Sequence, residues 1–77
     1  MSEPLPPIKY QIPLGTYEHY SGKRCSVIGV ARHSETLEEM VVYTELGDGN
    51  LWVRPAAMFV EDVEVKGKII PRFRFLQ

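Results

Sequence analysis

The sequence predicts an all-β domain, a small curled barrel of five or six short strands. Short runs rich in β-branched and aromatic residues recur along the chain. Turn-forming residues separate these runs at intervals of roughly eight to twelve residues, the spacing of small all-β domains. No segment keeps a helical pattern for more than about one turn. The 77 residues suffice for one domain with a small core.

The composition is that of a folded protein, with 44% hydrophobic and 25% charged residues. The single cysteine, Cys25, cannot form an internal disulfide, and it begins an apolar run, so we expect a small buried hydrophobe. The first residues lack the basic start and apolar run of a signal peptide, and no window reaches the ~20 apolar residues of a membrane span. We therefore expect a cytoplasmic protein with no membrane partner.

The charge balance bears on nucleic-acid binding. Ten acidic residues outweigh nine basic ones, and the formal net charge is −1. Nucleic-acid modules usually carry a basic excess, because each phosphate contact requires a Lys or Arg. Nucleic acid is therefore a possible partner but a disfavoured one. A local basic patch would still form if Arg32, Arg54, Arg72 and Arg74 converged on one face.

Residues 1–13 hold four of the six prolines, and we expect them to form a flexible, extended arm, either mobile or laid on the domain. The PxxP match at Pro4 and Pro7 is typical of ligands for other domains, although a solvated leader is the simpler interpretation. The β-domain is expected to span residues 14–77.

The first two strands are expected at residues 17–20 and 24–32, on either side of a Ser21-Gly22 turn. The interior Gly29 indicates a bend or β-bulge in the second strand. A third strand is expected at residues 39–46. The alternative, a helix capped by Ser34, is limited to a single turn by the β-rich run that follows.

The second half begins with the clearest turn signal, residues 47–50, which read Gly-Asp-Gly-Asn and predict a hairpin. The returning strand, residues 51–54, stops at Pro55, which fits the first position of a short helical turn over residues 55–59. Strands are then expected at residues 60–66 and 69–76.

Three polar residues in a row, His33, Ser34 and Glu35, raise the question of chemistry. Adjacent side chains in extended chain point to opposite faces, so Ser34 would diverge from His33 while Glu35 shares its face. Three interpretations stay open: a polar turn held by local hydrogen bonds, a ligand-binding loop, and an acid–base pair. No glycine-rich elbow precedes Ser34, and we assign no catalytic residue.

Trp52 and Arg54 form the second candidate group. If Leu51 and Val53 face the core, Trp52 and Arg54 share the outer face and present an apolar surface beside a bidentate donor. In the opposite register Trp52 is a core residue. A metal site would draw on His19, Cys25 and His33, but none of them lies in a metal-binding motif, so we expect neither metal nor cofactor.

Several short motifs together resemble one family of proteins. They are the Gly-x-Tyr-x-His-Tyr opening at residues 15–20, ARHSET at 31–36, VVY at 41–43, WVRP at 52–55, MF at 58–59 and PRF at 71–73. These motifs are similar to those of the DUF1653 family of small bacterial proteins, over about residues 15–73. The resemblance implies an SH3-like, partly open barrel and implies no activity. The loop between VVY and WVRP is shorter here than in many similar members.

The leading hypothesis is a non-enzymatic binding module for an unknown ligand or protein partner. Its expected binding residues are Arg32, His33, Ser34, Glu35, Trp52 and Arg54, with the loop continuing to Thr36. One alternative is a small enzyme that uses His33 and Glu35 as acid and base, so enzymatic activity stays an open question that leans toward none. Another is a barrel that binds single-stranded nucleic acid. A dimer is possible, because small barrels leave strand edges unpaired.

Overall fold

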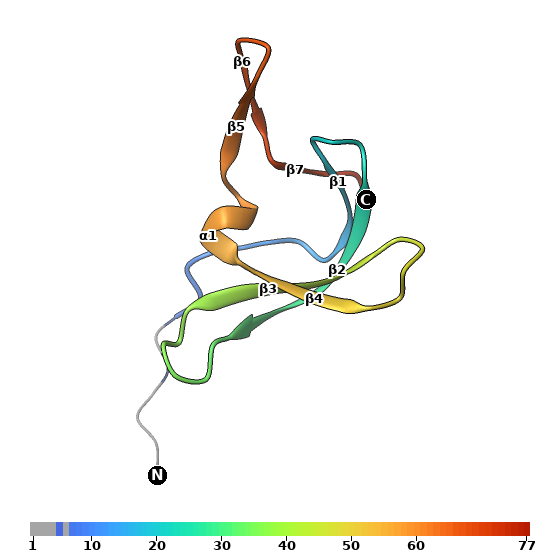
Figure 1. Ribbon diagram of the computed structural model, residues 1–77. Coiled ribbons are helices and arrows are strands. Elements are labelled where there is room, and N and C mark those ends of the chain that lie inside the picture. The colour runs from blue at the N-terminus through green and yellow to red at the C-terminus, as the bar shows by residue number, and fades with distance from the viewer. Residues whose placement is uncertain (1–4, 6) are drawn as a thin grey trace.

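The main sheet of the computed structural model, which describes residue 5 and residues 7–77, is antiparallel and has five strands. In spatial order its strands are β4 (Leu51–Pro55), β3 (Glu39–Glu45), β2 (Arg24–Arg32), β1 (Gly15–His19) and β7 (Phe73–Phe75). The short helix α1 (Ala56–Phe59) follows β4, and a separate two-stranded hairpin is formed by β5 (Asp62–Val65) and β6 (Lys68–Pro71). Figure 1 shows this hairpin projecting from the sheet beyond α1.

The all-β class is confirmed, and so is the short helical turn after Pro55. The described residues contain seven strands rather than five or six, because the expected strand at residues 69–76 is divided. Pro71 has no N–H and ends β6, and the next residue leaves the hairpin. The Arg72 N–H donates to the Glu61 carbonyl at 2.9 Å, while the Arg72 carbonyl accepts from Tyr20 N–H at 2.9 Å. The chain thus passes from one sheet to the other at Arg72.

The bend expected at Gly29 is a β-bulge between β2 and β3. The register passes from Val27 opposite Tyr43 to Gly29 opposite Val42, which leaves Ile28 as the extra residue on β2. A bulge bends its strand and increases the local twist. The bend curls the sheet around one apolar face, as the curved β2 and β3 in Figure 1 show.

The core lies on this inner face and is built from few side chains. Its buried members are Tyr17, Cys25, Val27, Val41, Tyr43, Ala56 and Phe59. Phe59 joins α1 to the sheet, because its ring meets the edge of Tyr17 at 5.1 Å and stacks on Phe73 at 4.2 Å. Cys25 is 3% exposed, which confirms the expected buried thiol.

The part of the arm that the structure describes lies against this core. Tyr10 and Ile12 pack on the core cluster, and the Tyr17 hydroxyl donates to the Pro13 carbonyl at 2.7 Å. The Glu39 carboxylate accepts the backbone N–H groups of Lys9 and Tyr10 at 2.7 and 2.9 Å. The PxxP match at Pro4 and Pro7 falls largely outside the described residues. Among those residues no helix is long and apolar enough to cross a membrane.

Candidate binding site

The loop that carries His33, Ser34 and Glu35 is a closed turn between β2 and β3. His33 Nδ1 accepts the backbone N–H groups of Glu35 and Thr36 at 3.1 and 3.3 Å. The His33 carbonyl accepts Leu37 N–H at 2.9 Å, with Leu37 in a left-handed conformation at φ 63°. All residues from His33 to Glu38 are exposed. The imidazole therefore completes a local backbone turn, as in the polar-turn interpretation.

This geometry also bears on the predicted acid–base pair. A backbone N–H can only donate, so Nδ1 of His33 must be unprotonated to accept from Glu35 N–H. Nδ1 is then not a donor that the Glu35 carboxylate could hold. The open surface around the turn offers no walls for a reaction. The arrangement argues against an enzyme built on His33 and Glu35.

Trp52 and Arg54 share one face of β4, as expected, but this face is the inner one. Trp52 lies opposite the buried Tyr43, and Arg54 lies opposite the buried Val41. Directly opposite residues in an antiparallel pair share a face, so of the two registers considered the chain adopts the one in which Trp52 and Arg54, rather than Leu51 and Val53, face inward. Trp52 remains 45% exposed because β4 is an edge strand.

The structure separates Trp52 from the His33 turn. The Trp52 Nε1–H donates to Asp48 Oδ2 at 3.3 Å, in the turn between β3 and β4. The His33 turn lies at the opposite end of β3, where Arg32 pairs with Glu39. The six residues expected to bind one ligand therefore occupy different ends of the sheet. Ser34 and Glu35 lie in the same turn as His33, whereas Arg54 lines a separate pocket.

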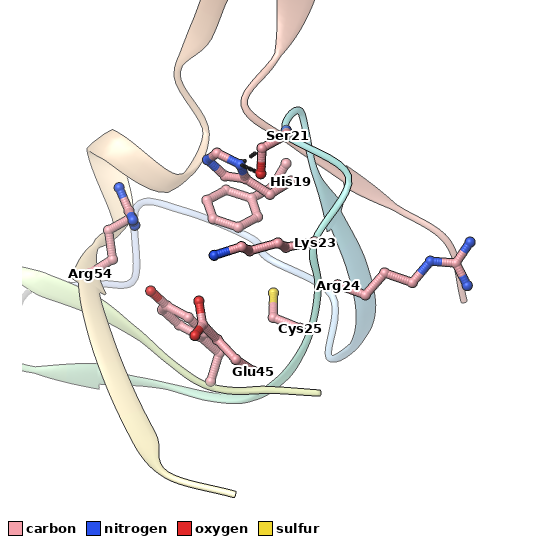
Figure 2. Close-up of a pocket in the computed structure, with 9 residues that line it drawn as sticks. His19, Ser21, Lys23, Arg24, Cys25, Glu45 and Arg54 are labelled. Atoms are coloured by element: carbon pink, nitrogen blue, oxygen red, sulfur yellow. Dashed lines mark hydrogen bonds between the residues drawn. The ribbon is translucent and has the colours of Figure 1, made fainter. Parts of the chain in front are cut away.

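This pocket has a volume of about 180 Å³ and is assembled from five strands and one turn. It is lined by His19, Ser21, Lys23, Arg24, Cys25, Tyr43, Glu45, Arg54 and Phe73, and we call it the His19–Arg54 pocket. Figure 2 shows Arg54 at one side, His19 at the top, Lys23 in the middle and Glu45 below. Strand pairing places His19 opposite Phe73 and Cys25 opposite Glu45, whereas Arg54 lies opposite Val41, farther along β3.

Arg54 is partly buried, and the described residues give its guanidinium neither a hydrogen bond nor an ion pair. Its Nε atom is buried without a partner, and its Cζ lies 5.5 Å from the centre of the Phe73 ring. Arg72 also has an unpartnered Nε, but its Nη2 pairs with Glu61 at 3.0 Å. A charge that leaves bulk water normally acquires a counter-charge, because its desolvation is costly. Arg72 is therefore ion-paired, whereas Arg54 has no ion pair with the described residues.

His19 forms one wall of the pocket. Its Nδ1 accepts Ser21 N–H at 3.2 Å and lies 2.8 Å from Ser21 Oγ, the contacts dashed in Figure 2. Because Nδ1 accepts a backbone N–H, the neutral ring carries its proton on Nε2. Burial, and then the positive charges of Arg54 and Arg72, lowers the pKa of His19 below its ordinary value of 6.5. His19 is thus a neutral donor at pH 7.

The pocket also contains the Cys25 thiol and the charged side chains of Lys23 and Glu45. Burial, and then the negative charge of Glu45, raises the pKa of the Cys25 thiol, which disfavours the reactive thiolate. Lys23 and Glu45 carry opposite charges but are not within ion-pair distance of each other, and the described residues offer their side chains no other ion pair. Among the described residues no group of three or more His, Cys, Asp or Glu could hold a metal ion.

Sequence reasoning placed Arg54 in a binding site but missed His19, Lys23 and Glu45. The local signal was the sequence His-Tyr-Ser at residues 19–21, in which an imidazole precedes a turn. That signal says nothing about Glu45 or Arg54, which reach the same place through strand pairing. Only the register of four strands brings these residues to one pocket.

The fold and the pocket define a class: small all-β proteins with a polar pocket built on the strands of a curled, open sheet. Within it, the chain belongs to the DUF1653 family, described as proteins of unknown function, whose model matches residues 15–75. The chain is similar to a DUF1653 protein of known crystal structure from Bordetella bronchiseptica, with 32% identity and a TM-score of 0.77. The match covers 84% of this chain and 87% of that one. No curated protein matches the chain.

Proposed function

We propose that the chain is a non-enzymatic binding module whose ligand places an anionic group in the His19–Arg54 pocket. The observation that carries the proposal is the partly buried Arg54 guanidinium, which forms neither a hydrogen bond nor an ion pair with the residues that the structure describes. A carboxylate or phosphate would supply that charge, and an arginine binds either group through paired N–H donors. Arg54 is the residue that this proposal shares with the site expected from the sequence.

Two neighbours of Arg54 support the same ligand chemistry. Lys23 lines the pocket as a second cation, and neutral His19 offers the Nε2–H as a donor. Such a set resembles anion sites in which one arginine fixes geometry and further donors add strength. The pocket is large enough for a compact group rather than for a whole drug-sized molecule, since ligand pockets commonly measure about 300–1,000 Å³.

The proposal keeps two further expectations from the sequence. We place the module in the bacterial cytoplasm, because its one cysteine is a free buried thiol, which suits a reducing compartment. We also retain the SH3-like description as an interpretation of the curled five-stranded sheet.

The test is an NMR titration of the full chain with inorganic phosphate and with acetate at low salt. We expect amide shifts at the residues that line the pocket, and we expect Arg54→Gln to weaken binding by roughly tenfold, the effect of one charge-assisted hydrogen bond. Lys68→Gln is the matched control, because it removes one positive charge at an exposed position of the hairpin. Equal losses in the two variants, or no shifts at the pocket, would contradict the proposal.

A further inference from the structure

A second cavity adjoins the first and shares a wall with it. It measures about 330 Å³ and is lined by Glu18, His19, Tyr20, Gly22, Ile70, Pro71 and Arg74. We call it the Tyr20 cavity. His19 lines both cavities, so groups of one ligand that occupied the two cavities would both lie beside the same imidazole. The hairpin residues Ile70 and Pro71 give the second cavity an apolar side.

An aromatic side chain, Tyr20, lines the second cavity and packs against the shared His19. The Tyr20 side chain is 47% exposed, and its ring centre lies 4.4 Å from that of His19 at an interplanar angle of 36°. His19 is supported from behind by the Phe73 ring, at 4.9 Å. A half-exposed ring held by its neighbours suits stacking against a flat heterocycle, which is how proteins bind unpaired bases.

Positive charge gathers around the two cavities although the whole chain is acidic. Lys23, Arg24, Arg54 and Arg74 line them together with Glu18 and Glu45, a local net charge of +2. The whole chain carries −1, so the rest of the molecule carries −3. The acidic balance of the sequence therefore conceals a basic surface. Of the four arginines considered in the sequence, Arg54 and Arg72 contribute positive charge that lowers the pKa of His19, and Arg74 lines the Tyr20 cavity.

Glu45 distinguishes the ligand from a bare anion. Its carboxylate makes no hydrogen bond or ion pair with the described residues, and it lies in the same pocket as Arg54. The Glu45 carboxylate would only repel a simple phosphate, because both groups are negatively charged. Beside a ligand that also carries hydroxyl or amino groups, it accepts their hydrogen bonds, as acidic side chains do for ribose hydroxyls in nucleotide sites.

From these observations, and resting on the proposed function, we propose that the ligand is a nucleotide unit. Its phosphate binds Arg54 and Lys23, its sugar hydroxyl or base amino group donates to Glu45, and its base stacks on Tyr20. The unit is either a free nucleotide or one residue of a single-stranded nucleic acid. These two sources share the same chemistry at the site.

The experiment compares inorganic phosphate, adenosine 5′-monophosphate and a short single-stranded oligoadenylate as ligands of the full chain, by NMR at low salt. We expect the monophosphate to bind at least about tenfold tighter than inorganic phosphate, from the stacked base. Tyr20→Leu should abolish that gain, and Tyr20→Phe should keep it. Phe75→Leu is the matched control, because Phe75 is also 47% exposed and lines neither cavity. Glu45→Gln should lower the affinity for the nucleotide and raise the affinity for inorganic phosphate.

The outcomes separate the two proposals. A monophosphate that binds no tighter than inorganic phosphate, or a gain that survives Tyr20→Leu, overturns the nucleotide assignment and leaves the anion site in place. Absence of phosphate binding overturns the anion site itself. Acetate that binds as tightly as the monophosphate assigns the pocket to carboxylate ligands and also overturns the inference. Tighter binding of the oligonucleotide than of the monophosphate supports a single strand as the source, and equal affinity supports a free nucleotide.

Discussion

The two histidines show how one residue type serves two different purposes in this chain. Both accept a backbone N–H from the residue two positions later, through Nδ1. His33 is exposed and only completes its turn, whereas His19 is partly buried between two aromatic rings and lines both cavities. The difference comes from what surrounds each turn. The turns themselves also differ in length, because the His19 carbonyl accepts the N–H of Gly22 and the His33 carbonyl accepts the N–H of Leu37.

His19 should make the stability of the protein depend on pH. Its pKa is lowered in the folded state, so between the folded value and about 6.5 the unfolded chain binds more protons. The free energy of unfolding therefore falls as the pH falls below about 6.5, and this contribution is constant above it. Urea denaturation between about pH 5 and 8 measures the slope, and His19→Gln should reduce it.

Ser21→Ala is the control for this prediction. It removes the hydroxyl contact to His19 but keeps the imidazole and the backbone N–H that Nδ1 accepts. We expect Ser21→Ala to retain the slope of the wild type. An unchanged slope in His19→Gln would show that other groups cause it.

At the scale of single residues, the sequence was sufficient to predict burial but not orientation. Cys25 begins an apolar run, and it is buried. The role of His33 depends on the left-handed backbone conformation of Leu37. Leucine rarely adopts this conformation. No local pattern announces such a conformation, so a turn, a binding loop and an acid–base pair looked alike in the sequence.

Among the elements, β1 depends on a close approach of the C-terminal segment. Thr16 N–H donates to the Gln77 carbonyl at 2.7 Å, and Leu76 N–H donates to the Thr16 carbonyl at 2.8 Å. Gly15 has a φ of +138°, and a Cβ atom there would press on the Gln77 backbone and lie 3.1 Å from the Phe75 ring. Only glycine meets both conditions at this position.

We predict that Gly15→Ala destabilises the protein by about 1–3 kcal/mol, because it combines backbone strain with a clash against main-chain atoms. Gly29→Ala is the matched control, since Gly29 also lies in a strand but has no atom within 4 Å of the added Cβ. It should change stability by less than about 0.5 kcal/mol. Denaturant unfolding of both variants tests this, and equal effects would show that the C-terminal approach is unimportant.

Most elements could be read from local patterns, and the exceptions have a tertiary cause. The expected strand at residues 24–32 has the bounds of β2, and its bulge lies at the interior glycine. The break between β6 and β7 is different. It depends on Arg72 bonding to Glu61 on one side and Tyr20 on the other. These partners are 11 and 52 positions away, so no window of the sequence contains both.

The whole molecule rests on a core of few side chains, with Phe59 at its centre. Phe59 contacts Tyr17, Tyr43 and Phe73, which belong to three different strands of the main sheet. A chain of this size is expected to have a total stability of only about 4–12 kcal/mol, at 0.05–0.15 kcal/mol per residue. A single aromatic residue therefore supplies a large share of the stability of the fold.

Phe59→Ala should cost about 3–5 kcal/mol, the range for removing a buried aromatic ring. At about 4–8 °C per kcal/mol, the melting temperature should fall by more than about 10 °C, or the protein should fail to fold. Met58→Ala changes the neighbouring helical residue, which is 42% exposed, and should have a small effect. Thermal unfolding followed by circular dichroism measures both. Similar melting temperatures for the two variants would place the centre of the core elsewhere.

At this largest scale the fold class was predictable and the site was not. Alternating and β-branched runs were sufficient for an all-β domain, because each strand must bury one face. The His19–Arg54 pocket joins residues from β1, β2, β3, β4 and β7, which come from four separate parts of the sequence, residues 19–25, 43–45, 54 and 73. Trp52 and His33, which looked like partners, lie at opposite ends of β3.

The projecting hairpin has a mechanical consequence. Arg72 anchors its base, through backbone hydrogen bonds to Glu61 and Tyr20, while its far end, near Ile69, is exposed. The Tyr20 cavity has walls on both parts of the fold, with Ile70 and Pro71 on the hairpin and Glu18 and His19 on the main sheet. A movement of the hairpin about Arg72 would therefore change the width of this cavity.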